Sequence, residues 1–271
     1  MIDLMLLRIA AVLIAGAAAA YADFKTGLIP DKITYGAVAV GAVISLAAFD
    51  MQAFLIAGVV FAIGYALYYA GKIGGGDVKL FAGLALIMPV YEGRVFVLSV
   101  LFVAALAAAL WFGAYYAGRY ALRGVVLKGN EEGIKRALIL GIPLSVFLAF
   151  SLNAGLISYA YVAAIALPMA AALLFIAFEH GIRKEFFLAR VKIAELEEDE
   201  LIALDFMDEK QKEKLGVQFK GIIDEKLKKE LLSMGMKEVP VYRNLPRFGP
   251  FILAGIVFVV FLPAAVPLPA M

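Results

Sequence analysis

The sequence contains no cysteine and a single histidine, His180. Without cysteine there is no disulfide framework, no thiolate zinc site and no cysteine nucleophile. One histidine excludes a HExxH metalloprotease and every other site built from several histidines. A Ser-His-Asp triad would have to use His180, which ends an apolar segment beside Gly181-Ile182-Arg183-Lys184. An interfacial histidine is the simpler interpretation there, and we expect neither a metal ion nor a cofactor.

Apolar side chains dominate the composition. They make up 64% of the 271 residues, and the mean hydropathy is +0.92, whereas soluble domains carry about 45–50% apolar residues. Helices satisfy their own backbone groups in lipid, and about 20 residues cross about 30 Å of hydrocarbon. We predict an all-α polytopic membrane bundle of six to eight transmembrane helices with a small cytoplasmic α+β insert. The apolar runs lie at about residues 3–22, 33–49, 53–71, 78–90, 94–118, 137–153, 156–179 and 249–269.

The composition changes at about residue 180. From there to residue 248 charged residues are frequent, so we predict a soluble insert. Residues 224–232 have the pattern of an amphipathic helix, and residues 239–242 alternate like a short strand, although one of them is proline. The predicted parts are a transmembrane bundle over 1–179, the insert over 180–248 and a last transmembrane helix over 249–271.

The amino-terminal apolar run has a second interpretation. Ala20-Tyr21-Ala22 resembles a signal-peptidase site that follows an apolar stretch. A signal peptide begins with a basic segment, however, and here Asp3 precedes Arg8. We expect this run to be a retained membrane helix.

The distribution of basic residues predicts the orientation in the membrane. Of the 25 Lys and Arg residues, 23 lie in segments that face the same side if Met1 starts outside. Long loops count weakly under the positive-inside rule, so segment 180–248 carries little weight, but the three short segments still contain nine basic residues. These segments are therefore expected to be cytoplasmic, and they are 23–32, 72–79, 119–136 and 180–248.

Two aspartates, Asp23 and Asp77, stand at the edges of apolar runs on this predicted cytoplasmic side. A carboxylate at the centre of a membrane helix costs roughly 2.5–3.5 kcal/mol on insertion scales, so such acids usually have a function. Two carboxylates that share a proton and a water molecule can hydrolyse a peptide bond. From helix dipoles we predict Asp77, at a helix start, as the ionised base, and Asp23, at a helix end, as the protonated acid.

Three glycines, Gly74, Gly75 and Gly76, directly precede Asp77. Glycine allows close approach of the backbone and positive φ angles, which would let an extended substrate lie against the acid. The alternative is an ordinary glycine turn into a helix whose first turn carries Asp77.

The spacing of these motifs resembles the type IV prepilin peptidases, which are GxGD-type membrane aspartyl proteases. Asp23 is followed by Ile29-Pro30-Asp31-Lys32-Ile33-Thr34, and later comes Gly74-Gly75-Gly76-Asp77-Val78-Lys79-Leu80. The resemblance covers residues 1 to about 90 well and the rest loosely. It implies that Asp23 and Asp77 are the catalytic pair and that the three glycines, Lys79 and Pro30 belong to the loops that receive the substrate.

Within this family the chain looks more like the archaeal preflagellin and prepilin peptidases. Bacterial members usually carry a cytoplasmic cysteine-motif domain between the first two spans and often N-methylate the product, but this chain has no cysteine and a first loop of under a dozen residues. The resemblance therefore implies cleavage without methylation. The implied partners are pilin- or archaellin-like precursors with a short basic leader, cut at the cytoplasmic face of the cell membrane, and no nucleic acid.

Three other functions stay open at this point. A presenilin-type protease also uses GxGD, but the later runs contain no Pro-Ala-Leu motif. An ion-coupled transporter would use Asp23 and Asp77 as relay acids, although the two halves show no repeat. A scaffold for pilus assembly would need neither acid. The sequence does not decide the precursor, the role of the insert, the number of spans in 119–179, the oligomeric state or the distance between the two acids.

Overall fold

The computed structural model describes residues 3–70, 73–196, 201–207, 223, 225–233, 238–243 and 245–265. The chain divides into two compact units. The first consists of Met1–Trp111, Tyr159–Pro168 and Arg247–Met271, and the second of Phe112–Ser158 and Met169–Pro246. The two predicted catalytic aspartates both lie in the first unit.

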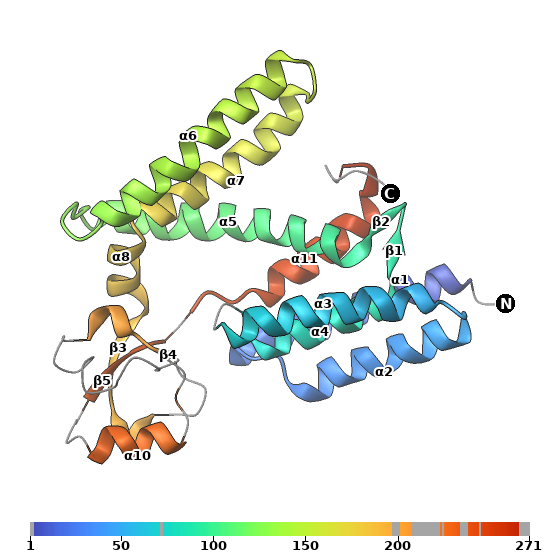
Figure 1. The fold of residues 1–271 in the computed structure, drawn as a ribbon, viewed down its shortest axis with the longest axis horizontal. Helices are drawn as coiled ribbons and strands as arrows, with labels where there is room; N and C mark the ends of the chain where they lie inside the picture. The colour runs from blue at the N-terminus through green and yellow to red at the C-terminus, as the bar shows by residue number, and fades with distance from the viewer. Residues whose placement is uncertain are drawn as a thin grey trace. The chain divides into compact units, whose positions relative to one another are not determined.

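Each of the eight apolar runs forms a helix (Figure 1). Observed and predicted ends differ by one to six residues at most positions, and the helix formed by the last run stops earlier than expected. The helices are α1 (Leu4–Thr26), α2 (Asp31–Ala47), α3 (Met51–Tyr69), α4 (Gly75–Ile87), α5 (Phe96–Leu122), α6 (Glu131–Asn153), α7 (Tyr159–Ala177) and α11 (Gly249–Phe261). A short hairpin connects α4 to α5, and its strands, β1 (Val90–Tyr91) and β2 (Arg94–Val95), have two residues each.

Helix α4 forms the centre of the first unit. It is apolar on all sides, and its residues from Leu80 to Ile87 are buried, as expected for a helix enclosed by others. It packs against α2 and α3. Small residues make these contacts close, because a Cβ built on Gly41 would lie 2.6 Å from the Cβ of Leu86, and one on Gly83 would lie 2.9 Å from the Cβ of Ala37.

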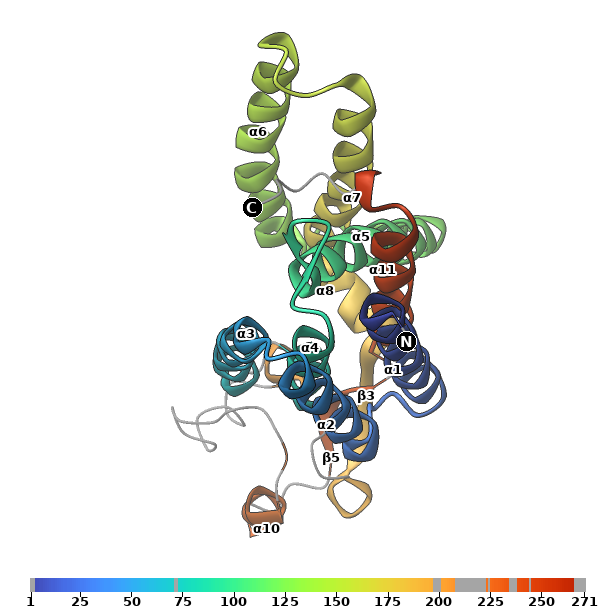
Figure 2. The ribbon, with the colours of Figure 1, turned by 90° about the vertical axis from the view of Figure 1, so that its right-hand side faces the viewer.

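Helices α1 and α11 pack side by side, although they lie at opposite ends of the sequence (Figure 2). Val12 and Ile256 are among the buried side chains of this part of the core. The contact brings the first residues of α11 to the last turn of α1. This end of the pair is where Asp23 lies.

Five of the described helices, α1, α3, α5, α6 and α7, are long and apolar enough to cross a membrane. Large apolar side chains on their surfaces are exposed, for example Leu55, Ile63 and Phe147, which suits a lipid environment. The chain is thus a mostly helical, multi-pass membrane protein. Helices α2, α4 and α11 are shorter, with 17, 13 and 13 residues, so the prediction of six to eight spans stays a prediction.

The second unit contains a short helix, α8 (Glu179–Ile182), a π-helical turn (Arg183–Phe187) and a three-stranded antiparallel sheet. The strands are β3 (Leu188–Lys192), β4 (Leu201–Ile202) and β5 (Glu238–Tyr242), in the order β3-β5-β4. Helix α10 (Glu225–Ser233) buries Leu227 and Leu231 in the same small core as β5. The amphipathic helix and the strand predicted over 239–242 are both confirmed, and the domain boundaries at 179 and 248 stay predictions.

Proline is unusual in a central strand because it lacks a backbone donor. Pro240 pairs with Arg190 of β3, and its carbonyl accepts a hydrogen bond from the N–H of Ala203 on the other side. The N and C=O of a residue in a strand point to the same side. The nitrogen of Pro240, which has no hydrogen to donate, therefore faces the end of the short strand β4. No hydrogen bond to β3 is lost.

Candidate active site

Asp23 lies in the last turn of α1 and is buried, with 7% of its surface exposed. The helix ends at Gly27, whose φ of 77° is left-handed and whose N–H donates to the carbonyl of Asp23 at 2.8 Å. This is the usual glycine termination of a helix. The termination places the Asp23 side chain inside the protein, beside the start of α11.

The carboxylate of Asp23 has a backbone partner. The N–H of Gly249, the first residue of α11, donates to its Oδ2 at 2.7 Å. The positive end of the α11 dipole therefore points at the carboxylate. Only glycine fits here without a shift, since a Cβ at Gly249 would lie 2.7 Å from the Cβ of Asp23. Sequence analysis missed this residue as part of the site, and its one local signal is the Gly-Pro step that starts α11.

Asp77 is the third residue of α4, after Gly75 and Gly76, and Gly74 is the N-cap. The backbone N–H of Gly74 interacts favourably with its carboxylate. An acid three residues after the N-cap that reaches back to the cap N–H is half of a capping box. Asp77 thus has a structural role in starting α4, as the alternative interpretation of this motif predicted, and its carboxyl remains partly exposed.

The three glycines differ in what they do. None of them has a positive φ, so the left-handed conformation that glycine allows is not used here. Close approach is confirmed for Gly76, because a Cβ there would lie 2.9 Å from the carbonyl oxygen of Ile29. A Cβ on Gly75 would make only ordinary contact, at 3.4 Å, with the ring of Tyr68. Gly76 is therefore the glycine that lets α4 meet the loop between α1 and α2.

Pro30 ends this loop as the N-cap of α2, with an extended backbone (φ −62°, ψ 145°). Its carbonyl accepts hydrogen bonds from the N–H groups of Ile33 and Thr34. Pro30 directly precedes the second helix, and Asp31 is the first residue of that helix. Pro30 shapes the segment that Gly76 contacts.

Lys79 forms an ion pair with Asp31 at 2.6 Å, and its Nζ lies 4.8 Å from the centroid of the Tyr35 ring. These contacts connect the first turns of α4 and α2. The side chains of Lys79 and Asp31 are 28% and 62% exposed, so the pair contributes at most about 1 kcal/mol to stability. The resemblance implied only that Lys79 belongs to the substrate loop, and the ion pair with Asp31 is an addition from the structure.

Asp23 and Asp77 are close enough to influence each other. Asp77 lies at the loop end of α4, outside the five helices that are long enough to span. Its pKa is raised from 3.8 to about 6, first by burial and then by the negative charge of Asp23, against the lowering effect of the Gly74 backbone. The direction of this shift is opposite to the one that the helix dipole alone predicts for Asp77, because burial and the second acid outweigh the dipole.

Among the residues with a described position, no group of three or more His, Cys, Asp or Glu side chains lies together. The arrangement contains one buried carboxyl, Asp23, with a backbone donor, and one partly buried carboxyl, Asp77, with a raised pKa. Two such carboxyls can act as a general acid and a general base on a water molecule.

Comparison with known families finds a match. The model described as the type IV leader peptidase family matches residues 10–118. Over these residues the chain is similar to the type IV leader peptidase family. The match includes Asp23, Pro30, the three glycines, Asp77 and Lys79. It supports leader-peptidase activity, and so a protease that acts on prepilin-type precursors, as the resemblance of the motifs had implied.

The match to the type IV leader peptidases ends within α5, so α6, α7, the insert and α11 lie beyond it. Gly249 is therefore a contribution to the site from outside the matched segment. No curated protein and no solved structure matches the chain significantly. The branch within the family stays a prediction.

Proposed function

We propose that this protein is an aspartyl endopeptidase that removes the short basic leader of pilin- or archaellin-like precursors at the cytoplasmic face of the cell membrane. Asp23 and Asp77 are its catalytic pair. The observation that carries the proposal is that α1 and α4 each bring one carboxyl to the same end of the first unit, with the charge of one acting on the other.

The environments of the two acids suggest their roles. Asp23 accepts the N–H of Gly249 at Oδ2, a contact that suits a charged carboxylate, so we assign it as the base that takes a proton from water. Asp77, whose pKa is raised to about 6, holds the proton and donates it to the scissile carbonyl oxygen. The water oxygen bonds to the carbonyl carbon. The C–N bond then breaks as the leaving nitrogen takes a proton from Asp23, and Asp77 takes back a proton from a hydroxyl of the intermediate, which leaves the new carboxylic acid and restores both acids.

The loops around the pair fit this chemistry. Gly76 packs against Ile29, so the start of α4 and the α1–α2 loop form one surface beside the acids. Pro30 and the Lys79–Asp31 pair border that surface, and we assign them to substrate positioning. The positive-inside pattern of the loops favours the cytoplasmic side.

The substrate class rests on the family. A leader with basic residues, a small residue at the junction and then an apolar helix would present its junction where the membrane helix of the precursor begins. We further propose that the product amino terminus is not methylated, since the chain has no cysteine-motif domain between α1 and α2.

Cleavage of a tagged prepilin-like precursor in membranes tests the proposal. The wild type is expected to shorten the precursor at the leader junction, whereas Asp23→Asn and Asp77→Asn leave it intact. Asp3→Asn is the matched control, because it changes an exposed aspartate at the other end of α1 that still caps the helix as asparagine. Mass spectrometry of the product in the presence of S-adenosylmethionine is expected to find an unmodified amino terminus.

Two results would contradict this assignment. If either Asp→Asn variant still cuts, the two-aspartate mechanism is wrong. If the wild type leaves several such precursors intact while both variants abolish ion flux into proteoliposomes, the two acids serve a transporter instead.

A further inference from the structure

A cavity of about 290 Å³ lies in the second unit, apart from the two aspartates. Its walls are the loop between α5 and α6 and the turn that contains α8. The volume is close to the lower end of the ~300–1,000 Å³ range of small-molecule sites. It suits a small group such as a lipid headgroup.

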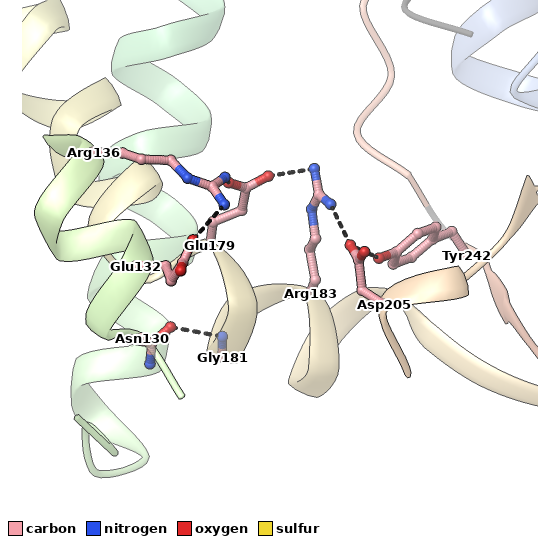
Figure 3. Close-up of polar contacts among 8 residues, drawn as sticks. All are labelled: Asn130, Glu132, Arg136, Glu179, Gly181, Arg183, Asp205 and Tyr242. Carbon is pink, nitrogen blue, oxygen red and sulfur yellow. Dashed lines mark hydrogen bonds and ion pairs between the residues drawn. The ribbon is translucent and has the colours of Figure 1, made fainter. Parts of the chain in front are cut away.

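Hydrogen bonds fix these walls in place. Asn130 is buried, with 1% of its surface exposed, and its Oδ1 accepts from the N–H of Gly181 at 2.9 Å (Figure 3). Its Nδ2 donates to the carbonyl of Val126 at 2.8 Å and to the hydroxyl of Tyr120 at 3.2 Å. Gly181 is required, because a Cβ there would lie 2.2 Å from the Tyr120 hydroxyl. These contacts therefore give the walls of the cavity a fixed shape.

The charge around the cavity is mostly positive. Its lining includes Arg123, Lys128 and Lys184, with Glu185 as the one acid among the lining residues. Arg123 pairs with Glu185 and lies over the ring of Phe186. Within the part of the chain that the structure describes, neither Lys128 nor Lys184 has a carboxylate partner. Two lysines thus remain to bind an anion.

The neighbouring acids do not neutralise these two lysines, because those acids already form ion pairs with arginines. Glu179 forms ion pairs with Arg136 and Arg183, and Arg183 also pairs with Asp205 (Figure 3). The acidic and basic side chains of this network pair with one another. The two cavity lysines keep their positive charge available.

The position of the cavity favours a lipid as the source of that anion. It borders the loop between the ends of α5 and α6, two helices long enough to span a membrane. This loop places exposed Val125, Val126 and Leu127 between Arg123 and Lys128. An apolar segment flanked by basic residues is typical of the membrane surface, and basic pockets at helix ends on the cytoplasmic side bind anionic headgroups.

We propose that this cavity is a binding site for the phosphate group of an anionic membrane lipid, held by Lys128 and Lys184. The site is separate from the proposed catalytic pair and does not depend on the protein being a peptidase. Arg123 is held by Glu185 and completes the positive wall. His180, stacked on Phe206 at 4.8 Å between ring centroids, closes one side.

The test uses the full-length protein in a neutral detergent. Dioleoylphosphatidylglycerol, dioleoylphosphatidylcholine and inorganic phosphate are titrated separately, and the Tm is followed, since a ligand of the folded state raises it. Phosphatidylglycerol is expected to raise the Tm in a saturable way. At the same concentrations, phosphatidylcholine and inorganic phosphate are expected to leave the Tm unchanged. In K128Q/K184Q the apparent affinity for phosphatidylglycerol falls by about tenfold or more.

Two further variants separate this site from general charge attraction. K135Q/K192Q removes two exposed lysines elsewhere in the same unit and is expected to keep the wild-type affinity. K128R/K184R keeps the charge and is expected to retain binding. All four lysines are exposed, so the Tm without lipid is expected to be unchanged.

Equal loss of affinity in K135Q/K192Q, or equal stabilisation by phosphatidylcholine, would overturn the proposal. Saturation by inorganic phosphate at the same concentration as the lipid would assign the site to free phosphate and overturn the lipid source. Each of these outcomes is independent of whether a precursor is cleaved.

Discussion

The backbone N–H of Gly249 donates to the Oδ2 of Asp23 across 2.7 Å, although the two residues are 226 positions apart in the chain. Both residues are buried. A carboxylate at the carboxyl end of one helix is unfavourable, and the amino end of a second helix offsets that effect. The contact explains how Asp23 is tolerated inside the protein.

Gly249→Ala is expected to lower kcat/KM for precursor cleavage by about ten- to hundredfold, because the new Cβ would lie 2.7 Å from the Cβ of Asp23 and displace the carboxylate. The measurement is a cleavage time course with purified protein. Gly36→Ala is the control, since it is a helical glycine with no heavy atom within 4 Å of the new Cβ. Equal activity of the two variants would show that the contact does not position Asp23.

Gly76 and Gly75 offer a second matched pair. Gly76→Ala is expected to reduce cleavage at least tenfold, because its Cβ would lie 2.9 Å from the carbonyl oxygen of Ile29 and push α4 away from the loop. Gly75→Ala adds the same methyl group at ordinary contact distance, 3.4 Å, from Tyr68 and is expected to keep most of the activity. The reverse order in a kinetic comparison would refute the role assigned to Gly76.

The raised pKa of Asp77 predicts how activity depends on pH. If Asp77 donates a proton, kcat/KM falls as pH rises through about 6, because the carboxyl then loses its proton. A profile of kcat/KM between about pH 4 and about pH 8 measures this limb. A flat profile across about pH 6 would contradict the role of Asp77 as the acid.

The same pKa shift predicts an effect on stability. The pKa of Asp77 is higher in the folded state than the ordinary 3.8. The contribution of this carboxyl to the free energy of unfolding is therefore fully present below about pH 4 and is lost as pH rises through about 6. Wild type is therefore expected to lose free energy of unfolding relative to Asp77→Asn over this range. Unfolding experiments at several pH values check this, and parallel curves would count against the shift.

A buried ion pair at the opposite end of α1 predicts a large stability effect. Arg8 donates to Asp50 at 2.8 Å, and their side chains are only 10% and 22% exposed. Arg8→Met leaves the carboxylate unpaired and is expected to cost about 3 kcal/mol of unfolding free energy. Arg8→Met combined with Asp50→Asn is expected to cost less than the sum of the single changes, which a double-mutant cycle measures.

Much of the fold follows from local patterns in the sequence. The eight apolar runs became eight helices because a membrane segment must satisfy its own backbone, and this requirement is visible in any long run. The strand at Glu238–Tyr242 was visible as alternation. Pro30 stands at the start of a helix, a place that its fixed φ suits.

The contacts between distant residues were not predictable in the same way. Arg8–Asp50 and Lys79–Asp31 join positions 42 and 48 apart, and no local pattern records such a pair. The direction of the Asp77 pKa shift was not predictable either, because helix position was visible in the sequence whereas burial and the neighbouring charge of Asp23 were not. Gly249 was missed since it acts through its backbone N–H, which every residue except proline possesses.

The hydrogen bond between α1 and α11 also sets an order of events during biosynthesis. Asp23 is synthesised 226 residues before the donor of its hydrogen bond. A nascent chain that has not reached α11 carries the acid without that donor, however well its earlier helices are inserted. This contact therefore forms only after translation has passed α11, and a ribosome that stalls before this point leaves Asp23 without its donor.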